Sequence, residues 1–359
     1  MDMPRGKRDI VETKTVRMGE EHIDGALIQE AGEIIRGGGL VAFPTETVYG
    51  LGGDALNPLS SRKIYAAKGR PSDNPLIVHI ADMEALPLIA EEVPESAGKL
   101  AGRFWPGPLT MILKKSEKVP YETTGGLDTV AVRMPVNRIA RELIRAAGGY
   151  VAAPSANRSG RPSPTSARYV SEDLAGRVEM IIDGGDVPIG LESTIVDLTV
   201  DRPVILRPGY ITRQMLEEVL AEVDEDSTLM RDDSGQAPRA PGMKYRHYAP
   251  RGDLTVIGGA EENVVSYINE KCAEQNRINK RTGVIGTDET IGRYCADVRR
   301  SVGSRTDEEQ IARELFRILR EFDDEHVEII YAEAFDDSGI GRAIMNRLLK
   351  AAGHKLINV

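Results

Sequence analysis

The chain has 359 residues and a formal net charge of −10, with 41% hydrophobic and only 5% aromatic residues. This length suits one large domain or two ordinary ones, and the acidic balance with few aromatic side chains disfavours a broad nucleic-acid-binding face. The polar N-terminus has no apolar stretch typical of a signal peptide, and no apolar run is long enough to span a membrane. We therefore expect a soluble, cytoplasmic protein with no membrane partner.

From Leu40 to about Leu220, short apolar runs mix with amphipathic segments, and many of the runs are rich in valine and isoleucine and bounded by glycine or proline. The runs predict strands at 40–43, 76–80, 109–113, 130–133, 151–153, 180–182, 194–198 and 204–206. The amphipathic segments predict helices at 24–36, 59–68, 94–103, 138–147, 166–174 and 212–223. Because strands and helices do not alternate strictly, the pattern favours a twisted mixed sheet covered by helices over a simple doubly wound fold.

The segment 224–242 is acidic and contains serine, glycine and proline with little periodic apolarity, which predicts a linker. Its continuation to Pro250 carries two tyrosines, two cations and a histidine. A solvated loop explains this composition, and so does a loop that folds back over a site as a lid. Both interpretations stay open at this point.

Residues 254–359 predict a second, smaller α/β unit. Strands are expected at 254–257, 282–285 and 327–331, and helices at 261–274, 308–322 and 340–352. Regular alternation of this kind indicates parallel pairing and a Rossmann-like layer arrangement.

The common catalytic motifs are missing. The chain contains no GxxxxGK[ST], HExxH or GxSxG, and Cys272 and Cys295 lack the spacing of a zinc site or a disulfide framework. The pair Gly339 and Gly341 begins a dinucleotide-like pattern, but Ile344 replaces the third glycine, so a turn before a helix is expected there. The sequence therefore carries no signature of a P-loop protein, a protease, a serine hydrolase or a zinc enzyme.

Polar residues gather instead between Pro44 and His79. Lys68 and Arg70 flank a turn and can clamp a triphosphate, although cations are also common at any helix C-terminus. His79 lies in an apolar strand, where a buried structural histidine and a substrate contact are both reasonable. The combination indicates a polyanion site.

Further polar residues follow other predicted strands. Arg133 ends an apolar strand, at the sheet edge where α/β proteins place their sites, and its guanidinium suits a carboxylate. Ser155 and Asn157 can bond phosphate or ribose, or simply form a local turn. Their shared position at strand ends favours one common site.

Several sequence blocks, in order along nearly the whole chain, resemble the Sua5/YrdC/YwlC family in its longer Sua5 type. They are PTETVYGL at 44–51, KGRPSDNP at 68–75, FWPGPLT at 104–110, PSAN at 154–157, EST at 192–194, the segment 241–248 and the segment 330–348. The resemblance implies a twisted, mixed-sheet YrdC-like catalytic domain at 1–223, a linker and active-site lid at 224–251, and a smaller Rossmann-like Sua5 C-terminal domain at 252–359.

The resemblance also implies a nucleotidyltransferase reaction, in which L-threonine, bicarbonate and ATP give L-threonylcarbamoyladenylate and pyrophosphate. The product would pass to the tRNA threonylcarbamoyltransferase machinery, which modifies adenosine 37 of tRNAs that read ANN codons. Such chemistry needs positioning and charge neutralisation rather than a side-chain nucleophile. No catalytic side chain and no protein metal site are expected, and Mg²⁺ would be bound mainly through the phosphates.

The roles carried over by motif divide into two groups, with Lys68 and Arg70 as the key cations. The residues expected to bind L-threonine are Thr47, His79, Arg133, Ala153 and Ser193. The residues expected to bind ATP are Lys68, Arg70, Asn74, Thr129, Ser155, Ser163, Arg207 and His247, with Tyr245 as a further linker candidate.

Two alternatives remain. A carbamoyltransferase of hydrogenase maturation also contains a YrdC-like domain, but the family pattern includes zinc-finger cysteine pairs that this chain lacks. A YrdC-like domain acting as an RNA-binding module is disfavoured by the acidic composition, and steeply salt-dependent tRNA binding without ATP turnover would support it.

Overall fold

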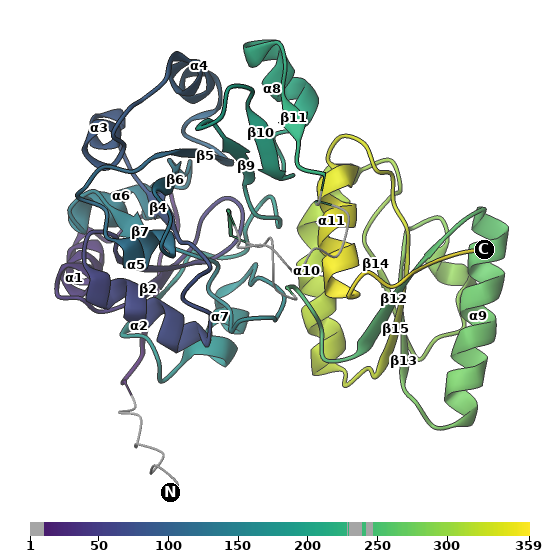
Figure 1. The fold of residues 1–359 in the computed structure, drawn as a ribbon. Helices are drawn as coiled ribbons and strands as arrows, with labels where there is room; N and C mark the ends of the chain where they lie inside the picture. The colour runs from purple at the N-terminus through teal and green to yellow at the C-terminus, as the bar shows by residue number, and fades with distance from the viewer. Residues whose placement is uncertain (1–10, 228, 230–238, 242–246) are drawn as a thin grey trace, which may run out of the picture.

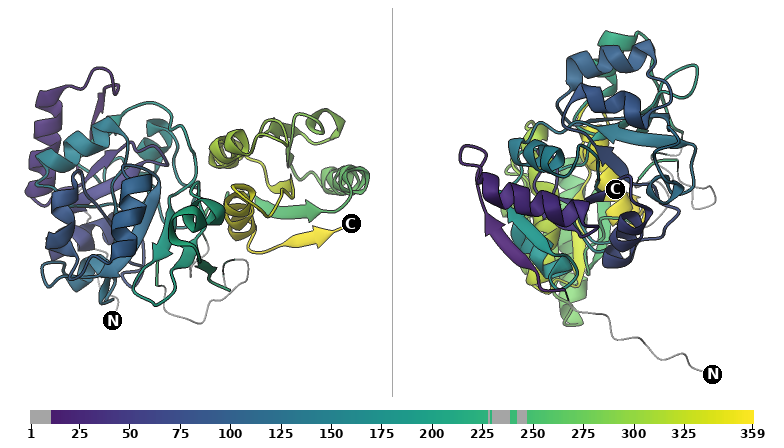
Figure 2. Two further views of the ribbon diagram at one scale, coloured as in Figure 1. Left: turned by 90° about the horizontal axis from the view of Figure 1, so that it is seen from above. Right: turned by 90° about the vertical axis from the view of Figure 1, so that its left-hand side faces the viewer.

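The computed structural model describes residues 11–227, 229, 239–241 and 247–359. Two α/β units lie side by side, each built on its own sheet (Figures 1 and 2). None of the helices in the described ranges combines the length and the apolar character needed to cross a membrane. The predicted α/β class is confirmed.

The first unit contains an eleven-stranded mixed sheet within the described residues. Its strands are β1 (Lys14–Arg17), β2 (Val41–Phe43), β3 (Gly50–Asp54), β4 (Ile77–His79), β5 (Leu109–Lys114), β6 (Thr129–Arg133), β7 (Val151–Ala152), β8 (Met180–Asp183), β9 (Thr194–Asp197), β10 (Val204–Arg207) and β11 (Asp224–Glu225). The order across the sheet is β1-β8-β2-β3-β7-β4-β6-β5-β9-β10-β11. The sheet combines parallel pairs such as β4 with β6 and antiparallel pairs such as β2 with β3, as the irregular sequence pattern predicted.

Helices pack on this sheet. They are α1 (Gly25–Arg36), α2 (Pro58–Lys68), α3 (Leu86–Ile89), α4 (Glu95–Phe104), α5 (Tyr121–Thr124), α6 (Arg138–Ala146), α7 (Ala167–Leu174) and α8 (Arg213–Leu220), with a 3₁₀ turn at Met83–Ala85. Thr212 caps α8, because its side chain accepts a hydrogen bond from the backbone N–H of Met215. Asp24 caps α1 in the same way.

Strand β3 was not predicted from the sequence. Its segment, Gly-Leu-Gly-Gly-Asp, is rich in glycine, which has low strand propensity. The packing explains the glycines: a Cβ on Gly52 would lie 2.8 Å from the ring of Phe43 and 2.9 Å from Val151. The packing of the neighbouring strands therefore requires glycine in β3, although glycine has a low intrinsic propensity for strands.

The second unit has a parallel sheet with the order β14-β13-β15-β12-β16, which confirms the predicted parallel pairing. Its elements are β12 (Asp253–Gly258), α9 (Glu261–Arg277), β13 (Thr282–Gly286), a 3₁₀ turn at Ile291–Arg293, β14 (Val298–Ser301), α10 (Glu308–Asp324), β15 (Ile329–Glu333), α11 (Gly341–Ala351) and β16 (Leu356–Asn358). Helix α9 covers the outer face, while α10 and α11 lie between the sheet and the first unit (Figure 1).

The two units share a buried interface. The guanidinium of Arg320, on α10, donates to Asp173 of α7 at 2.7 Å and to the carbonyl of Pro162 at 2.6 Å, and its side chain is 1% exposed. Asp224–Glu225, at the start of the predicted linker, forms β11 and pairs in parallel with β10. The linker therefore begins as an edge strand of the large sheet. Tyr245 lies outside the described residues.

Candidate active site

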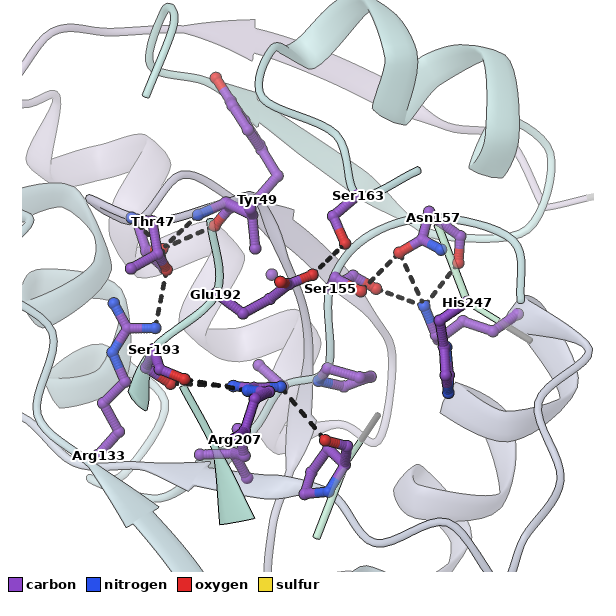
Figure 3. Close-up of a pocket in the computed structure, with 18 of the residues that line it drawn as sticks. Thr47, Tyr49, Arg133, Ser155, Asn157, Ser163, Glu192, Ser193, Arg207 and His247 are labelled. Atoms are coloured by element: carbon purple, nitrogen blue, oxygen red, sulfur yellow. Dashed lines mark hydrogen bonds between the residues drawn. The ribbon is translucent and has the colours of Figure 1, made fainter. Parts of the chain in front are cut away.

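A polar cavity of about 50 Å³ lies where the loops of the first unit meet the end of the linker (Figure 3). Of the residues predicted for the site that the structure describes, all except Asn74 and Thr129 line it. They are Thr47, Lys68, Arg70, His79, Arg133, Ala153, Ser155, Ser163, Ser193, Arg207 and His247. Residues from distant parts of the sequence thus meet in one place.

Arg133, at the end of β6, forms one side of the cavity. Its Nη1 donates to the Thr47 hydroxyl at 2.9 Å, and its Nη2 lies 2.6 Å from a carboxylate oxygen of Glu46. Both charged side chains are only 5% exposed. The guanidinium is therefore held in place next to the cavity by a buried counter-ion.

His79 pairs with Arg133 in the register of β4 and β6. Burial, reinforced by the positive charge of Arg133, lowers the pKa of His79 to about 3. Its Nδ1 lies 3.2 Å from the carbonyl of Ile77. The imidazole is neutral at physiological pH, so it offers a hydrogen bond without adding a charge.

Lys68 ends α2, and Gly69 takes the left-handed conformation (φ 65°) that turns the chain toward Arg70. The Lys68 ammonium donates to the carbonyls of Ser155 at 2.5 Å and Asn157 at 2.6 Å. Burial, together with the nearby charge of Arg70, lowers the pKa of Lys68 well below its usual value. An anion bound in the cavity would favour the charged form of the Lys68 amine.

Arg70 is positioned by Asn74, whose side-chain oxygen accepts from Nη2 at 2.5 Å. Asn74 accordingly lies behind Arg70 rather than in the cavity wall. Thr129 begins β6, four residues before Arg133, so the two lie roughly 13 Å apart along the strand. The structure therefore does not bring Thr129 to this cavity, and its role in ATP binding stays a prediction.

The opposite wall is formed around Arg207, at the end of β10. Its Nε donates to the carbonyl of Ser193 at 3.0 Å and its Nη2 to the Ser193 hydroxyl at 3.1 Å. Burial lowers the pKa of Arg207 to about 10, which leaves it protonated at neutral pH. Glu192 precedes Ser193 and accepts from the Ser163 hydroxyl at 2.5 Å (Figure 3).

The linker reaches the cavity through Pro241 and His247. The His247 side chain is buried, and its Nε2 has no hydrogen-bond partner among the residues that the structure describes. Burial, followed by the charge of Arg70, lowers its pKa well below the usual value. A buried ring nitrogen without a partner can bond a group that enters the cavity.

The charge balance of the lining is strongly positive. The lining contains four basic side chains, those of Lys68, Arg70, Arg133 and Arg207. Among the described residues, Glu192 is the single carboxylate in this lining. In those same ranges, no three His, Cys, Asp or Glu side chains are grouped to hold a metal ion. The arrangement can bind a polyanion at one end and a carboxylate at the other.

Comparison with known proteins agrees with this geometry. Residues 33–209 match the Sua5/YciO/YrdC family profile, described as "Telomere recombination", and residues 211–353 match the profile "Threonylcarbamoyl-AMP synthase, C-terminal domain". The threonylcarbamoyl-AMP synthase of Pyrococcus abyssi is 50% identical over 94% of this chain and 98% of its own length. That of Bacillus subtilis is 48% identical over 92% and 94%. The chain belongs to the threonylcarbamoyl-AMP synthase family.

Solved structures of relatives share the fold. P. abyssi Sua5 complexed with L-threonine matches with a TM-score of 0.90 and 48% identity, covering 97% of this chain and 99% of that one. E. coli YciO matches with a TM-score of 0.50 and 27% identity, covering 55% of this chain and 95% of its own. The two-unit arrangement of this threonylcarbamoyl-AMP synthase family member is thus shared with Sua5.

Sequence reasoning missed three features of the site. Glu192 lies in a quoted motif and lines the cavity, but no role was assigned to it. Glu46, inside PTETVYGL, could have been flagged as a carboxylate between two threonines in an otherwise apolar turn. Tyr248 lies in the quoted segment 241–248, but its packing against Phe316 of α10 (ring centroids 5.1 Å apart) had no local signal, because it depends on the second unit.

Proposed function

We propose that this protein condenses L-threonine, bicarbonate and ATP into L-threonylcarbamoyl-AMP, pyrophosphate and water. The observation that carries the proposal is one cavity with a neutral histidine and a buried arginine at one end and three further cations beyond it. The relatives named threonylcarbamoyl-AMP synthase, and the Sua5 structure with L-threonine bound, support the same substrates.

At the amino-acid end, Arg133 binds the threonine carboxylate. Its guanidinium already carries two anchors, the Thr47 hydroxyl and the Glu46 carboxylate, so little ordering is needed when the substrate arrives. Neutral His79 and the Ser193 hydroxyl offer hydrogen bonds to the amine or hydroxyl of threonine. Ala153 adds only a small side chain and its backbone there.

At the nucleotide end, Lys68, Arg70 and Arg207 neutralise the triphosphate, while Ser155 and Ser163 contribute hydroxyl groups. The phosphates would compete with the carbonyls that now accept from Lys68. Mg²⁺ would accompany ATP as part of the substrate, coordinated by phosphate oxygens and water, because the cavity wall offers few carboxylates.

The reaction needs no side-chain nucleophile. The threonine amine combines with bicarbonate to give an N-carboxylate and water, and a carboxylate oxygen then attacks the α-phosphorus as pyrophosphate leaves. Fixed cations around the reacting phosphate stabilise the developing charge, and holding three reactants together removes much of the entropic barrier. The adenylate would feed N6-threonylcarbamoyladenosine formation in tRNA, in the cytoplasm.

The end of the linker forms part of the cavity wall. Pro241 and His247 close one side of the cavity. We infer that Pro241 and His247 move outward to admit ATP and then return over it. The lid interpretation of the linker rests on the position of these two residues in the cavity wall.

The test is incubation of the purified chain with ATP, Mg²⁺, labelled bicarbonate and a panel of amino acids, followed by mass detection. The expected result is a threonine-dependent product containing label and AMP, together with pyrophosphate. A Lys68→Ala variant in parallel should lose most of the product. Label in the adenylates of many amino acids alike, or no labelled adenylate, would overturn the proposal.

A further inference from the structure

Helix α11 of the second unit brings a buried arginine to the back of the cavity wall. Arg347 is fully buried, and its Nε donates to Glu192 Oε2 at 2.9 Å. Its Nη2 lies 3.5 Å from the backbone carbonyl of the same residue. Arg347 therefore holds both the side chain and the backbone of a residue that lines the site.

Glu192 connects Arg347 to two residues that we place next to the substrates, Ser163 and Ser193. Its other carboxylate oxygen accepts from the Ser163 hydroxyl at 2.5 Å, and its backbone leads directly into Ser193. Ser193 in turn receives two hydrogen bonds from Arg207. A shift of the Glu192 carboxylate would thus move Ser163, Ser193 and the guanidinium beside them.

The charges explain why Glu192 needs Arg347. Burial by itself would raise the pKa of Glu192, but the positive charges of Arg347 and then Arg207 outweigh it and keep the carboxyl ionised. Without Arg347 the carboxylate would become protonated or turn toward Arg207, which Ser193 now orients. Either response disturbs the wall of the cavity.

The same guanidinium also supports the end of the linker. It lies over the ring of Tyr248 at 5.7 Å from the centroid, on a tyrosine that stacks on Phe316 of α10. Tyr248 is the neighbour of His247 and itself lines the cavity. One residue of the second unit thus braces the cavity at two points.

We propose that Arg347 is a positioning residue for the synthesis, acting through Glu192 to hold Ser163 and Ser193 in the geometry that the substrates need. This inference rests on the proposed function. It gives the second unit a defined task, which is to complete the cavity wall of the first.

The experiment compares full-length variants in the adenylate assay, with both substrates varied. Arg347→Met removes the contact and keeps much of the side-chain volume. The matched control is Arg342→Met, on the same helix. Arg342 also bridges the units (2.8 Å to Glu225 of β11), but its ion-pair partners Glu225 and Asp337 do not line this cavity, whereas Glu192 does. Folding of every variant is checked by circular dichroism and by thermal unfolding.

We expect kcat/KM of Arg347→Met to fall about 10- to 100-fold, since small displacements of positioning groups have effects of this size. Part of the loss should appear as higher KM values for ATP and L-threonine, whereas a merely structural defect would leave both KM values unchanged. Arg347→Lys should recover part of the activity. Arg342→Met should stay within about twofold of the wild type.

A double-mutant cycle with Glu192→Gln tests the route of the effect, because residues that act as one unit are not additive. The double variant should be no worse than Arg347→Met alone. Additive losses, or unchanged KM values in Arg347→Met, would overturn the positioning role. Should Arg347→Met fail to fold, Arg347→Lys and Glu192→Gln carry the same test, and unchanged KM values in both would refute it. A wild-type enzyme that makes no adenylate would instead refute the proposed function itself.

Discussion

Replacing Arg133 by methionine should destabilise the fold and weaken threonine binding, and a second substitution should separate these two effects. Arg133 Nη2 lies 2.6 Å from Glu46, and each side chain is only 5% exposed. Removing one partner of a buried ion pair costs about 3–5 kcal/mol of unfolding free energy, because the other charge stays buried without compensation. The double variant Glu46→Gln/Arg133→Met leaves no unpaired charge and should recover most of that loss.

Threonine binding should not recover with stability. The substrate carboxylate would lose a hydrogen bond to a charged group, which is worth about 1.5–3 kcal/mol, or roughly 10- to 150-fold in Kd. Urea unfolding measures the loss of stability, and calorimetric titration with L-threonine measures the change in Kd. Both measurements are made on the single and the double variant.

The control for the stability effect is Arg62→Met. Arg62 pairs with Glu122 at 2.7 Å, nearly the same distance, but its side chain is 66% exposed. An exposed pair contributes at most about 1 kcal/mol. Equal losses in Arg62→Met and Arg133→Met would refute the burial argument, and wild-type threonine affinity in the stable double variant would remove Arg133 from the threonine site.

Three further predictions concern the other residues of the cavity. Lys68→Ala and Arg70→Ala should each weaken ATP binding by more than about tenfold, because a lost charge-assisted hydrogen bond costs about 1.5–3 kcal/mol. An unchanged calorimetric affinity for ATP would exclude the substituted residue from the phosphate site. His247→Ala should weaken ATP binding and leave L-threonine binding unchanged, and the reverse pattern would contradict its placement beside the nucleotide. His79 has a folded-state pKa of about 3, below the usual 6.5, so the unfolded chain takes up the proton first and stability falls as the pH drops from about 6.5 toward 3. Between pH 7 and pH 5 the wild type should therefore lose about 2 kcal/mol of unfolding free energy that the His79→Gln variant retains. Urea unfolding at the two pH values measures both losses, and equal losses in the two proteins would contradict this prediction.

Most elements could be predicted from the sequence because their signals are local. The apolar run that forms β6 and the periodic segment that forms α10 each carry a pattern that survives in the fold. β3 could not be predicted in this way. Its Gly52 is required because the side chains of Phe43, across a turn, and Val151, far along the chain, leave no room for a Cβ atom. The short edge strand β11 was assigned to the linker for a similar reason: its two acidic residues become a strand only through pairing with β10.

For the site, the motifs identified residues that line one cavity, because the ends of neighbouring strands meet at one edge of a sheet. The residue types that meet there were therefore readable in advance, as the four basic residues Lys68, Arg70, Arg133 and Arg207 illustrate. The partners that orient these cations could not be predicted. Examples are Asn74, which accepts a hydrogen bond from Arg70, and Glu46, which forms an ion pair with Arg133. Ion pairs between residues as far apart as Glu192 and Arg347 have no local signature, so only the packing of the second unit against the first decides them.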